Sequence, residues 1–512
     1  MLGEVVRGAA ERHGTTAAIL RGAQVVSWEA IDRHADLAAA GLLAAGVGPG
    51  QVVASVLPSG AEWLVLAVAL DRVGAIHAAV SSHLAPDERG AVVASVEAGL
   101  TVVDPECVTG LPLRTSVVVV ERDGLLEELH GGQTAPSGRT VDPPTDRHTN
   151  VCFTSGTTGL AKGATFGVAQ LRAITRIDLG SAAESWGGGA PMLASTHFAH
   201  VGMALKLPWY ARTGSTLCVL DRWRAEDALE LVARHRMPTV GGVAAQVALM
   251  LRCDRFDEFD LTCVERLVVG GAPSSPRLVE EARRRFGARY SIRYSSTESG
   301  GVGLATADDA DDHEALHTVG RPRPGVEVRV VDEHGDPLPD GRTGELQLRS
   351  PAVTSGYWGD PEASAATVTP EGWVRTGDLA HVEESGCVVV DGRRTDMFIR
   401  GGYNVFPVEV EAVLETHPGV AAVAVVPRPD DVLGEVPVAF VVTRPGTPPP
   451  TLGDLRAHAA GRLARYKLPD ELVVVDELPV TAGDKLDRRS LRRRLDHRRT
   501  DPEGDPTEEA TP

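Results

Sequence analysis

The sequence has few cysteines and no long apolar segment. Its six cysteines are scattered over 512 residues without a C-x-x-C pair, which argues against a disulfide framework and a structural zinc site. The apolar run WLVLAVAL at 63–70 is interrupted by Asp71 and Arg72, and the N-terminal segment lacks the apolar core of a signal peptide. We therefore expect no membrane span and a cytoplasmic location.

A basic surface is also missing, because the formal net charge is -19, and this argues against a nucleic-acid partner. Lysine itself is scarce: it supplies only four of the 51 basic residues. Arginine fills nearly every place where a general surface cation would serve, so each remaining lysine is a candidate for a site that needs a compact ammonium group. These lysines are Lys162, Lys206, Lys467 and Lys485. For Lys206, an equal alternative is that the lysine was retained by chance and has no function.

The spacing of apolar residues predicts an α/β fold. Apolar positions recur at helical spacing in 30–46 and 62–75, whereas 52–58, 101–104 and 116–121 read as short buried strands. Strands that alternate with helices imply a doubly wound α/β sheet.

The same alternation continues in the middle of the chain and then gives way to a different pattern. We expect strands at 215–221 and 266–271 and helices at 225–235 and 275–287. From about residue 320, the segments VEVRVVDE, GELQLRS and GCVVVDG alternate at period two and predict an antiparallel β subdomain. Beyond DGRRTD, a helix and strands predict a small α+β domain, with PGTPPP as a loop inside it.

The stretch TSGTTGLAKG at 154–163 predicts a phosphate-binding loop. Its glycines allow the backbone N–H groups to approach a ligand, its hydroxyls add donors, and Lys162 adds a positive charge. It departs from the pattern G-x-x-x-x-G-K-[ST], because two apolar residues precede Lys162 and Gly163 follows it. The alternative is a flexible Ser/Thr/Gly linker, which rarely lies directly against a strand.

Three later segments suggest what the phosphate belongs to. The glycines of VGGAP at 269–273 would let a flat ring or an acyl chain lie against the backbone. Tyr294 is able to stack on a base, and Glu298 is a carboxylate suited to Mg²⁺. Asp378, which we expect in a turn, could accept both hydroxyls of a ribose. Each of these side chains could also be an ordinary loop residue.

In this order and spacing, the set resembles the adenylate-forming superfamily of acyl-CoA synthetases, aryl-CoA ligases and peptide-synthetase adenylation domains. FTSGTTGLAKG matches the phosphate loop of that family, YSSTE its adenine and magnesium motif, and TGDLA its ribose aspartate. DGRRTDMFIRGGYNVFPVEVE matches its hinge, and LPVTAGDKLDRRSL its catalytic-lysine loop. The resemblance covers nearly the whole chain.

The resemblance implies a fold with two domains. It predicts a large N-terminal domain at 1–392, built of doubly wound α/β sheets and the β subdomain, which binds ATP and the acid. A hinge at 393–396 leads to a small mobile α+β domain at 397–496, which carries the catalytic lysine. The acidic segment at 497–512 has almost no apolar residue, and we expect it to be a disordered tail.

The resemblance also implies a reaction in two steps, with ATP, Mg²⁺ and coenzyme A. A carboxylate attacks the α-phosphate of ATP to give an acyl-adenylate and pyrophosphate, and a thiol then attacks the adenylate. The catalytic residues would be Lys485, Thr297, Glu298 and His200, with Glu298 holding the metal. The nucleotide would be bound by Thr154, Ser155, Gly156, Thr157, Thr158, Gly159, Lys162, Gly271, Ala272, Pro273, Tyr294, Ser295, Ser296, Asp378 and Arg393.

The small domain carries the second half of the expected mechanism. It would swing about Asp396, move Lys485 away, and bring Arg400, Gly401 and Gly402 alongside the active site for the thiol step.

Four positions depart from the family pattern. Ala161 replaces a usual proline, Ser295 a usual glycine and Thr395 a usual lysine. Asp484 occupies the place of a glycine before Lys485, where a carboxylate could pair with the lysine. Adenylation is still expected, but these changes leave the efficiency of thioester formation open.

The sequence narrows the chemical class of the acid but does not identify it. The stretch ASTHFAHVGM at 194–203 has no acidic residue to bind an α-ammonium, and His200 resembles the gate of CoA ligases, although it could be merely structural. Small residues line the expected pocket, which favours an aryl or medium acyl acid; its residues are His200, Gly242, Val243, Gly271 and Ser296. His197 and Ser195 could add polarity.

Three alternatives remain open besides an acid:CoA ligase. The enzyme could pass its adenylate to a carrier protein or to an amine, it could activate an unusual acid such as nitrite, or the chain could be a nucleotide-binding sensor without catalysis. A homodimer is compatible with the sequence.

Overall fold

The computed structural model describes residues 1–112, 114–130, 146–154, 161–401, 403–430, 432–460, 462–481 and 486–500. By its internal contacts the chain divides into two compact units. The first unit comprises Met1–Ser274, Leu278–Arg329 and Gln347–Thr376, and the second comprises Ser275–Arg277, Val330–Leu346 and the chain from Gly377 onward. The expected hinge at 393–396 therefore lies inside the second unit.

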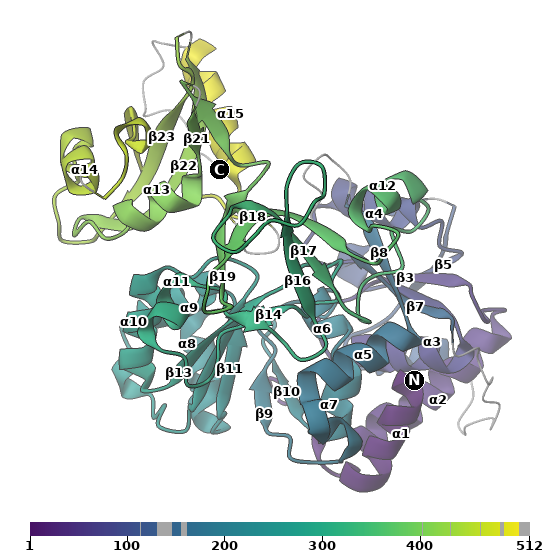
Figure 1. Ribbon diagram of the computed structural model, residues 1–512. Coiled ribbons are helices and arrows are strands. Elements are labelled where there is room, and N and C mark those ends of the chain that lie inside the picture. The colour runs from purple at the N-terminus through teal and green to yellow at the C-terminus, as the bar shows by residue number, and fades with distance from the viewer. Residues whose placement is uncertain are drawn as a thin grey trace. The chain divides into compact units, whose positions relative to one another are not determined.

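A six-stranded sheet forms the N-terminal part of the first unit (Figure 1). Its order is β6-β5-β3-β4-β7-β8, and every pair is parallel except β7 with β8. The strands are β3 (Val52–Val56), β4 (Ile76–Ala79), β5 (Leu100–Val103), β6 (Ser116–Val119), β7 (His148–Phe153) and β8 (Gly163–Gly167).

Both faces of this sheet are buried, which explains why its strands read as continuous apolar runs. Val53 and Val102 pack with α2 and α3 in one core cluster, while Ala54 and Val103 pack with α4 in another. The helices are α2 (Trp28–Ala44), α3 (Ala61–Val73) and α4 (Pro86–Ser95). The two helices and three strands predicted between residues 30 and 121 are thus present within a few residues of the expected ends.

A four-stranded sheet of order β2-β1-β10-β9 lies in the same unit. Its strands β1 (Ala17–Arg21), β2 (Gln24–Ser27) and β9 (Pro191–Leu193) are too short to show a period in the sequence, whereas β10 (Thr216–Val219) was predicted. The helices of this part, α1 (Leu2–His13), α5 (Val168–Leu179), α6 (Val201–Ala204) and α7 (Leu207–Thr213), contribute to the first core cluster.

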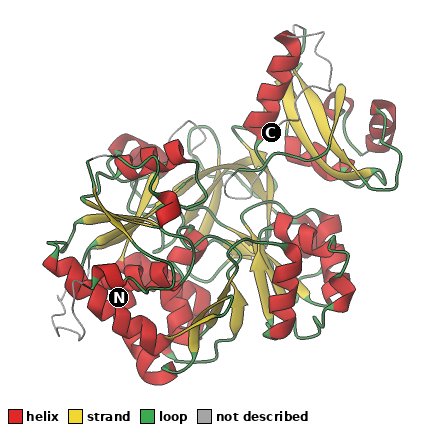
Figure 2. Cartoon of the chain, turned by 180° about the vertical axis from the view of Figure 1, so that it is seen from behind, coloured by secondary structure: helices red, strands yellow, loops and turns green. Residues whose placement is uncertain are grey.

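A five-stranded sheet of order β11-β12-β13-β14-β15 completes the first unit's α/β part. β11 (Thr239–Gly242), β12 (Arg266–Gly270) and β13 (Arg289–Tyr294) are parallel, and β14 (Leu304–Ala305) and β15 (Arg321–Pro322) are antiparallel. Four helices pack with these strands, and helices and strands bury their apolar side chains in a common core. The helices are α8 (Ala225–Arg234), α9 (Ala244–Leu251), α10 (Pro276–Phe286) and α11 (Asp312–His317). Figure 2 shows helices packed around yellow sheets in this region.

The period-two segments form a four-stranded sheet of order β16-β17-β18-β19. Its strands are β16 (Glu327–Val331), β17 (Gly344–Arg349), β18 (Val374–Val382) and β19 (Val388–Arg393), and α12 (Pro361–Thr367) precedes β18. Asp378 lies inside β18, so its prediction as a turn residue is wrong. Gly377 has φ +72 and the ladder shifts register after Leu379, and this local irregularity explains why the sequence resembles a turn.

The second unit carries a mixed sheet of order β21-β20-β23-β22, with β24 beside β23. Val423 and Val425 of β22 face a core with α13 and α14, whereas Ala424 and Val426 face α15. The elements are β20 (Phe398–Arg400), β21 (Tyr403–Val405), α13 (Pro407–Leu414), β22 (Val420–Asp430), β23 (Gly434–Thr443), α14 (Leu452–Ala459), β24 (Glu471–Val475) and α15 (Arg488–Thr500). α15 continues past His497, where the acidic tail was expected to begin, and residues 501–512 lie outside the described residues.

The expected fold class is confirmed: parallel α/β sheets, a β subdomain and a small C-terminal α+β unit. Within the described part of the chain, every helix is too short or too polar to cross a membrane. The cytoplasmic location and the homodimer stay predictions.

Candidate active site

The phosphate-loop stretch connects two antiparallel strands. β7 ends at Phe153 and β8 begins at Gly163, and the N–H of Thr154 donates to the carbonyl of Lys162 at 2.9 Å. A G-x-x-x-x-G-K-[ST] loop instead leads from a strand into a helix. This topology explains the departure from that pattern. Five of the predicted phosphate ligands lie outside the described residues: Ser155, Gly156, Thr157, Thr158 and Gly159.

Gly163, which replaces the hydroxyl residue of the other pattern, has a packing role. A Cβ at this position would lie 2.5 Å from Cγ1 of Val151 on the neighbouring strand. On its other side β8 is bonded to the segment before α12, because Trp358 N–H donates to the Gly163 carbonyl at 2.8 Å and Thr165 N–H to that of Gly356 at 2.9 Å. The exit of the loop is therefore fixed from both sides.

Lys162 and Glu298 are linked by a tyrosine that the sequence did not single out. The Lys162 ammonium lies 5.3 Å from the centre of the Tyr357 ring, and the Tyr357 hydroxyl donates to Oε1 of Glu298 at 2.6 Å. Burial, followed by the negative charge of Glu298, raises the pKa of Tyr357, so this hydroxyl remains a donor. Tyr357 belongs to no recognised motif, and its antiparallel bridge to Ala164, with the bonds of its neighbours Gly356 and Trp358 to β8, brings it to the loop.

A tight turn after β13 presents Thr297 and Glu298. Ser296 and Ser299 exchange hydrogen bonds between backbone N–H groups and hydroxyls at 3.0 and 3.1 Å. Gly300 has φ +74, and a Cβ there would also lie 2.5 Å from the carbonyl of Ala352. The two serines thus close the turn by hydrogen bonds, and Gly300 supplies the positive φ and the space that the turn requires.

The carboxyl ends of three adjacent parallel strands bring other predicted residues together. In open parallel sheets, ligands bind at this edge. Gly271, with φ +79, lets the chain leave β12, and a Cβ on it would be 3.4 Å from the Val243 side chain. The residues gathered here are Gly242 and Val243 after β11, Gly271, Ala272 and Pro273 after β12, and Tyr294, Ser295 and Ser296 after β13.

His200 caps helix α6 beside this edge. Its Nδ1 accepts from the N–H of Gly202 at 3.2 Å, and the side chain is exposed. Val201, the next residue, lies against Gly301, since a Cβ there would be 3.6 Å from Cγ2 of Val201. His200 is therefore close to the turn that carries Glu298.

His197 and Ser195 have structural partners. His197 Nδ1 accepts from Ala199 N–H at 3.1 Å, so its Nε2–H faces the Ser82 hydroxyl, also at 3.1 Å. Burial, with the nearby His83, lowers the pKa of His197 to about 3 and keeps it neutral. The Ser195 hydroxyl donates to the carbonyl of Gly241.

Asp378 and Arg393, the predicted ribose ligands, are cross-strand partners in the second unit. Arg393 Nε lies 3.0 Å from Oδ1 of Asp378, whose side chain is largely buried while the arginine is half exposed. One carboxylate oxygen is thereby oriented by a guanidinium.

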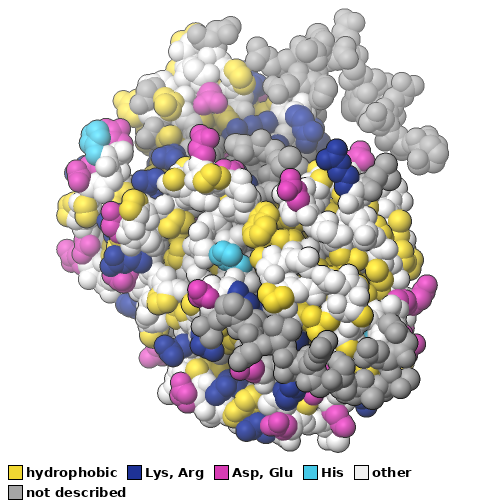
Figure 3. Space-filling view, turned by 90° about the vertical axis from the view of Figure 1, so that its right-hand side faces the viewer, with side chains coloured by type: hydrophobic (Ala, Val, Ile, Leu, Met, Phe, Trp, Pro, Cys, Tyr) yellow, Lys and Arg dark blue, Asp and Glu magenta, His cyan; other side chains and the backbone are white. Residues whose placement is uncertain are grey.

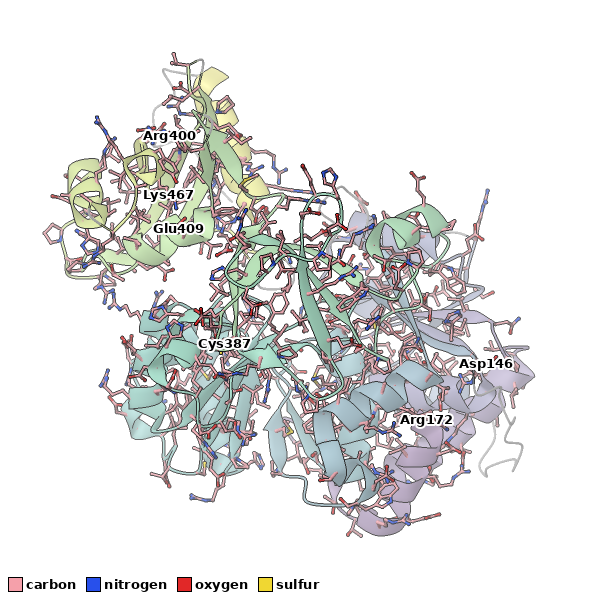
Figure 4. The ribbon with its side chains drawn as sticks, viewed as in Figure 1. Asp146, Arg172, Cys387, Arg400, Glu409 and Lys467 are labelled. Carbon is pink, nitrogen blue, oxygen red and sulfur yellow. The ribbon has the colours of Figure 1, made fainter. Side chains whose placement is uncertain are left out.

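Two arginines of the second unit contact the segment predicted as the hinge or lie just after it. Arg488 pairs with Asp396 at 3.5 Å and with Glu411. Arg400, labelled in Figure 4, donates to the carbonyls of Tyr466 at 2.9 Å and Leu468 at 3.1 Å. Gly401 has φ +56. Gly402, Asp484 and Lys485 lie outside the described residues.

Two of the four lysines have structural ion pairs. Lys206 lies 3.0 Å from Asp178, and Lys467 contacts both oxygens of Glu409 at 2.5 and 2.6 Å (Figure 4). Their retention has a local explanation, whereas Lys162 has an aromatic neighbour and no carboxylate among the described residues.

A single carboxylate at this site fits Mg²⁺ better than a metal that proteins hold by side chains alone. Among the described residues, no group of three or more His, Cys, Asp or Glu side chains could hold a metal ion. Mg²⁺ in nucleotide enzymes typically has one or two carboxylates and completes its shell with phosphates and water. Glu298 is compatible with that arrangement.

Comparisons with known proteins agree over both units. Residues 6–358 match the family described as AMP-binding enzyme, and residues 409–485 match AMP-binding enzyme C-terminal domain. The chain is 32% identical to an indoleacetate–CoA ligase of Aromatoleum aromaticum over 89% of this chain and 90% of that protein. It is 31% identical to the fatty acid–[acyl-carrier-protein] ligase ScoC of Streptomyces coeruleorubidus over 95% of both chains.

One solved structure adds a third acceptor class. The amide bond synthetase McbA of Marinactinospora thermotolerans superposes with a TM-score of 0.85 at 28% identity, covering 97% of this chain and 100% of that one.

Proposed function

The chain belongs to the adenylate-forming AMP-binding enzymes, in their acyl- and aryl-CoA synthetase branch, and from this premise we propose that it joins a carboxylic acid to coenzyme A at the expense of ATP. The expected family and enzyme class, an AMP-forming ligase, are confirmed. The observation that carries the proposal is the Lys162–Tyr357–Glu298 arrangement at the exit of a glycine-rich hairpin loop.

In the first step, an oxygen of the acid attacks the α-phosphorus of ATP and the bond to the β-phosphate breaks. The 154–162 loop and Lys162 stabilise the departing pyrophosphate, Thr297 donates to the α-phosphate, and Lys485 lies between the acid and that phosphate. Glu298 holds Mg²⁺, which neutralises phosphate charge when bound. Asp378 and Arg393 orient the ribose.

In the second step, the sulfur of CoA attacks the acyl carbon, and AMP leaves with the electron pair of the broken C–O bond. The small domain turns about Asp396 and exchanges Lys485 for the segment at 400–402. Arg400, already fixed by two carbonyls, would keep this segment in one conformation during the exchange.

The acid has an aryl ring or medium acyl chain and no α-amino group. No carboxylate occurs in 194–203, where an ammonium partner would be expected, and the expected pocket is lined by the small residues Gly242, Val243 and Gly271. A carrier protein or an amine is the second candidate acceptor, because ScoC carries a carrier-protein ligase name and McbA an amide-synthetase name.

The test is ATP–pyrophosphate exchange with a panel of aryl, acyl and amino acids that includes nitrite. Exchange with at least one acid is expected, and absence of exchange with all of them would leave a nucleotide-binding protein without catalysis. With the active acid, CoA, an acyl carrier protein and simple amines are then offered separately, and mass spectrometry identifies the product. A CoA thioester supports the proposal, whereas an amide or carrier thioester alone replaces it with the second candidate.

A further inference from the structure

Arg293 projects from the face of the five-stranded sheet opposite to Tyr294. The two residues are consecutive in β13, and successive strand side chains point to opposite faces. Gly270 is the register partner of Arg293 on β12, and a Cβ on Gly270 would lie 3.3 Å from that of Arg293. The glycine therefore leaves space beside the arginine side chain, next to the Gly271 turn.

The surroundings of Arg293 are rich in cations. Two carboxylates, Asp178 and Asp308, act on the charge of Arg293. Asp178, at the end of α5, already pairs with Lys206 at 3.0 Å and Arg323 at 2.5 Å, and Asp308 already pairs with Arg266. Although burial opposes its ionisation, Lys206 and Arg323 hold the pKa of Asp178 below its usual range. Both carboxylates that act on Arg293 are thus already paired with other cations.

In the described part of the chain the Arg293 guanidinium makes no hydrogen bond or ion pair, and Asp178 and Asp308 attract it only from beyond ion-pair distance. Burial, and then the charge of Arg323, lower the pKa of Arg293 to about 10, which leaves it charged at neutral pH in an environment that disfavours the charge. A partly buried, unpaired guanidinium is costly unless an anion approaches it.

The position of Arg293 relates it to the acid. Lys206 lies two residues after α6, and His200 caps the other end of that short helix. The acid is proposed to lie between His200 and the strand ends at Gly271 and Ser296. Arg293, near the carboxyl end of β13 and paired in register with Gly270, lies at this same sheet edge.

We propose that Arg293 binds a second anionic group of the substrate, remote from the carboxylate that is adenylated. The acid is then a dicarboxylic acid, or an acyl or aryl acid with a comparable second anion. This inference rests on the proposed function and narrows its substrate class. It also accounts for the rejection of α-amino acids, because the positive surroundings repel an ammonium group.

The test compares matched acids in pyrophosphate exchange. Straight-chain diacids of three to eight carbons are paired with monoacids of equal length, and the three benzenedicarboxylic acids with their monomethyl esters. At least one diacid should exceed its partner in kcat/KM by roughly tenfold to a hundredfold, the range of a charge-assisted hydrogen bond.

Arg293→Met, which keeps the length of the side chain, should remove that preference while retaining exchange with the monoacid partner. Arg293→Lys should retain part of the preference. Arg283→Met is the matched control, since Arg283 lies on α10, pairs with Asp312 and is not among the charges that act on Arg293, and its selectivity should equal that of the wild type.

The outcomes separate the two proposals. If no acid supports exchange, the proposed function fails. If monoacids are used as well as every diacid, or if Arg293→Met keeps the wild-type preference, the enzyme reading stands and the role of Arg293 is refuted. A circular dichroism melt of each variant excludes unfolding as the cause.

Discussion

Tyr357 stands between a lysine and a carboxylate, and neither its ring nor its hydroxyl was visible as functional in the sequence. Glu298 and Lys162 were found because their motifs preserve residue type and order. Tyr357 and Arg293 were missed because their contacts depend on strand register, which places Tyr357 beside Ala164 and Arg293 beside Gly270. Register is not encoded in a local motif.

Tyr357→Phe should weaken the binding of Mg²⁺ by Glu298 without abolishing it. The variant loses the hydrogen bond that orients Glu298 and keeps the ring beside Lys162. We expect the Mg²⁺ concentration needed for half-maximal pyrophosphate exchange to rise about tenfold, the usual effect of losing such a supporting partner. Tyr466→Phe, whose ring stacks on Tyr403, is the control, and an unchanged Mg²⁺ requirement for Tyr357→Phe would contradict the assignment of Glu298.

Lys485→Ala should lower adenylation at least a hundredfold, because it removes the cation proposed between the acid and the α-phosphate. ATP binding, measured by calorimetry, should stay within about threefold, as other groups hold the nucleotide. Lys467→Ala removes the ion pair with Glu409 and the contact with the Tyr466 ring, and should adenylate like the wild type. Wild-type rates in Lys485→Ala would refute the role.

The helices and strands predicted best are those whose sequence pattern has a single physical cause. The strands at 52–56 and 100–103 were recognisable because both of their faces are buried. Strand β18 was misread around Asp378, since Gly377 and the register shift imitate a turn. The short strands β1 and β2 gave no readable period, because sheet pairing with β10 determines them.

The connection between β19 and β20 allows a test of the hinge. Asp396 N–H donates to the Arg393 carbonyl at 3.1 Å, and proline would remove this donor and fix φ. Asp396→Pro should retain adenylation and reduce thioester formation at least tenfold, measured in separate half-reactions.

Asp396→Ala is the matched control, because it removes the carboxylate that faces Arg488 but keeps the backbone free. It should perform both half-reactions. Equal losses of both half-reactions in the proline variant would count against the hinge.

For the whole molecule, composition predicted the absence of a basic surface. On the face shown in Figure 3, acidic and basic side chains are interspersed among the described residues. The sequence predicts a large domain at 1–392 and a small one at 397–496, whereas the contacts divide the chain at Gly377 and assign Ser275–Arg277 and Val330–Leu346 to the second unit. Their boundary at Gly377 could not be read from the sequence, because it follows from tertiary contacts.

Two buried neutral histidines make the fold sensitive to acid. Burial lowers the pKa of His77 and of His197 to about 3, from 6.5 in the unfolded chain. The unfolded state therefore binds more protons between these values, and stability should fall as pH drops below about 6.5, by about 1.4 kcal/mol per pH unit for each histidine.

Thermal melts from pH 7 to 4 measure this dependence. His77→Gln should melt lower at pH 7, since it disturbs the contacts with Ser55 and Trp63, but its stability should decline less steeply with acid. A slope equal to that of the wild type would show that His77 does not contribute.

The contact of Lys162 with Tyr357, and of Tyr357 with Glu298, has a thermodynamic consequence. One ring serves two neighbours, so a ligand that displaces the lysine or reorients the carboxylate acts on the same side chain. Nucleotide and divalent ion would then be reciprocal effectors, each altering the other's dissociation constant by one common factor. Measuring that factor from either direction must give the same value.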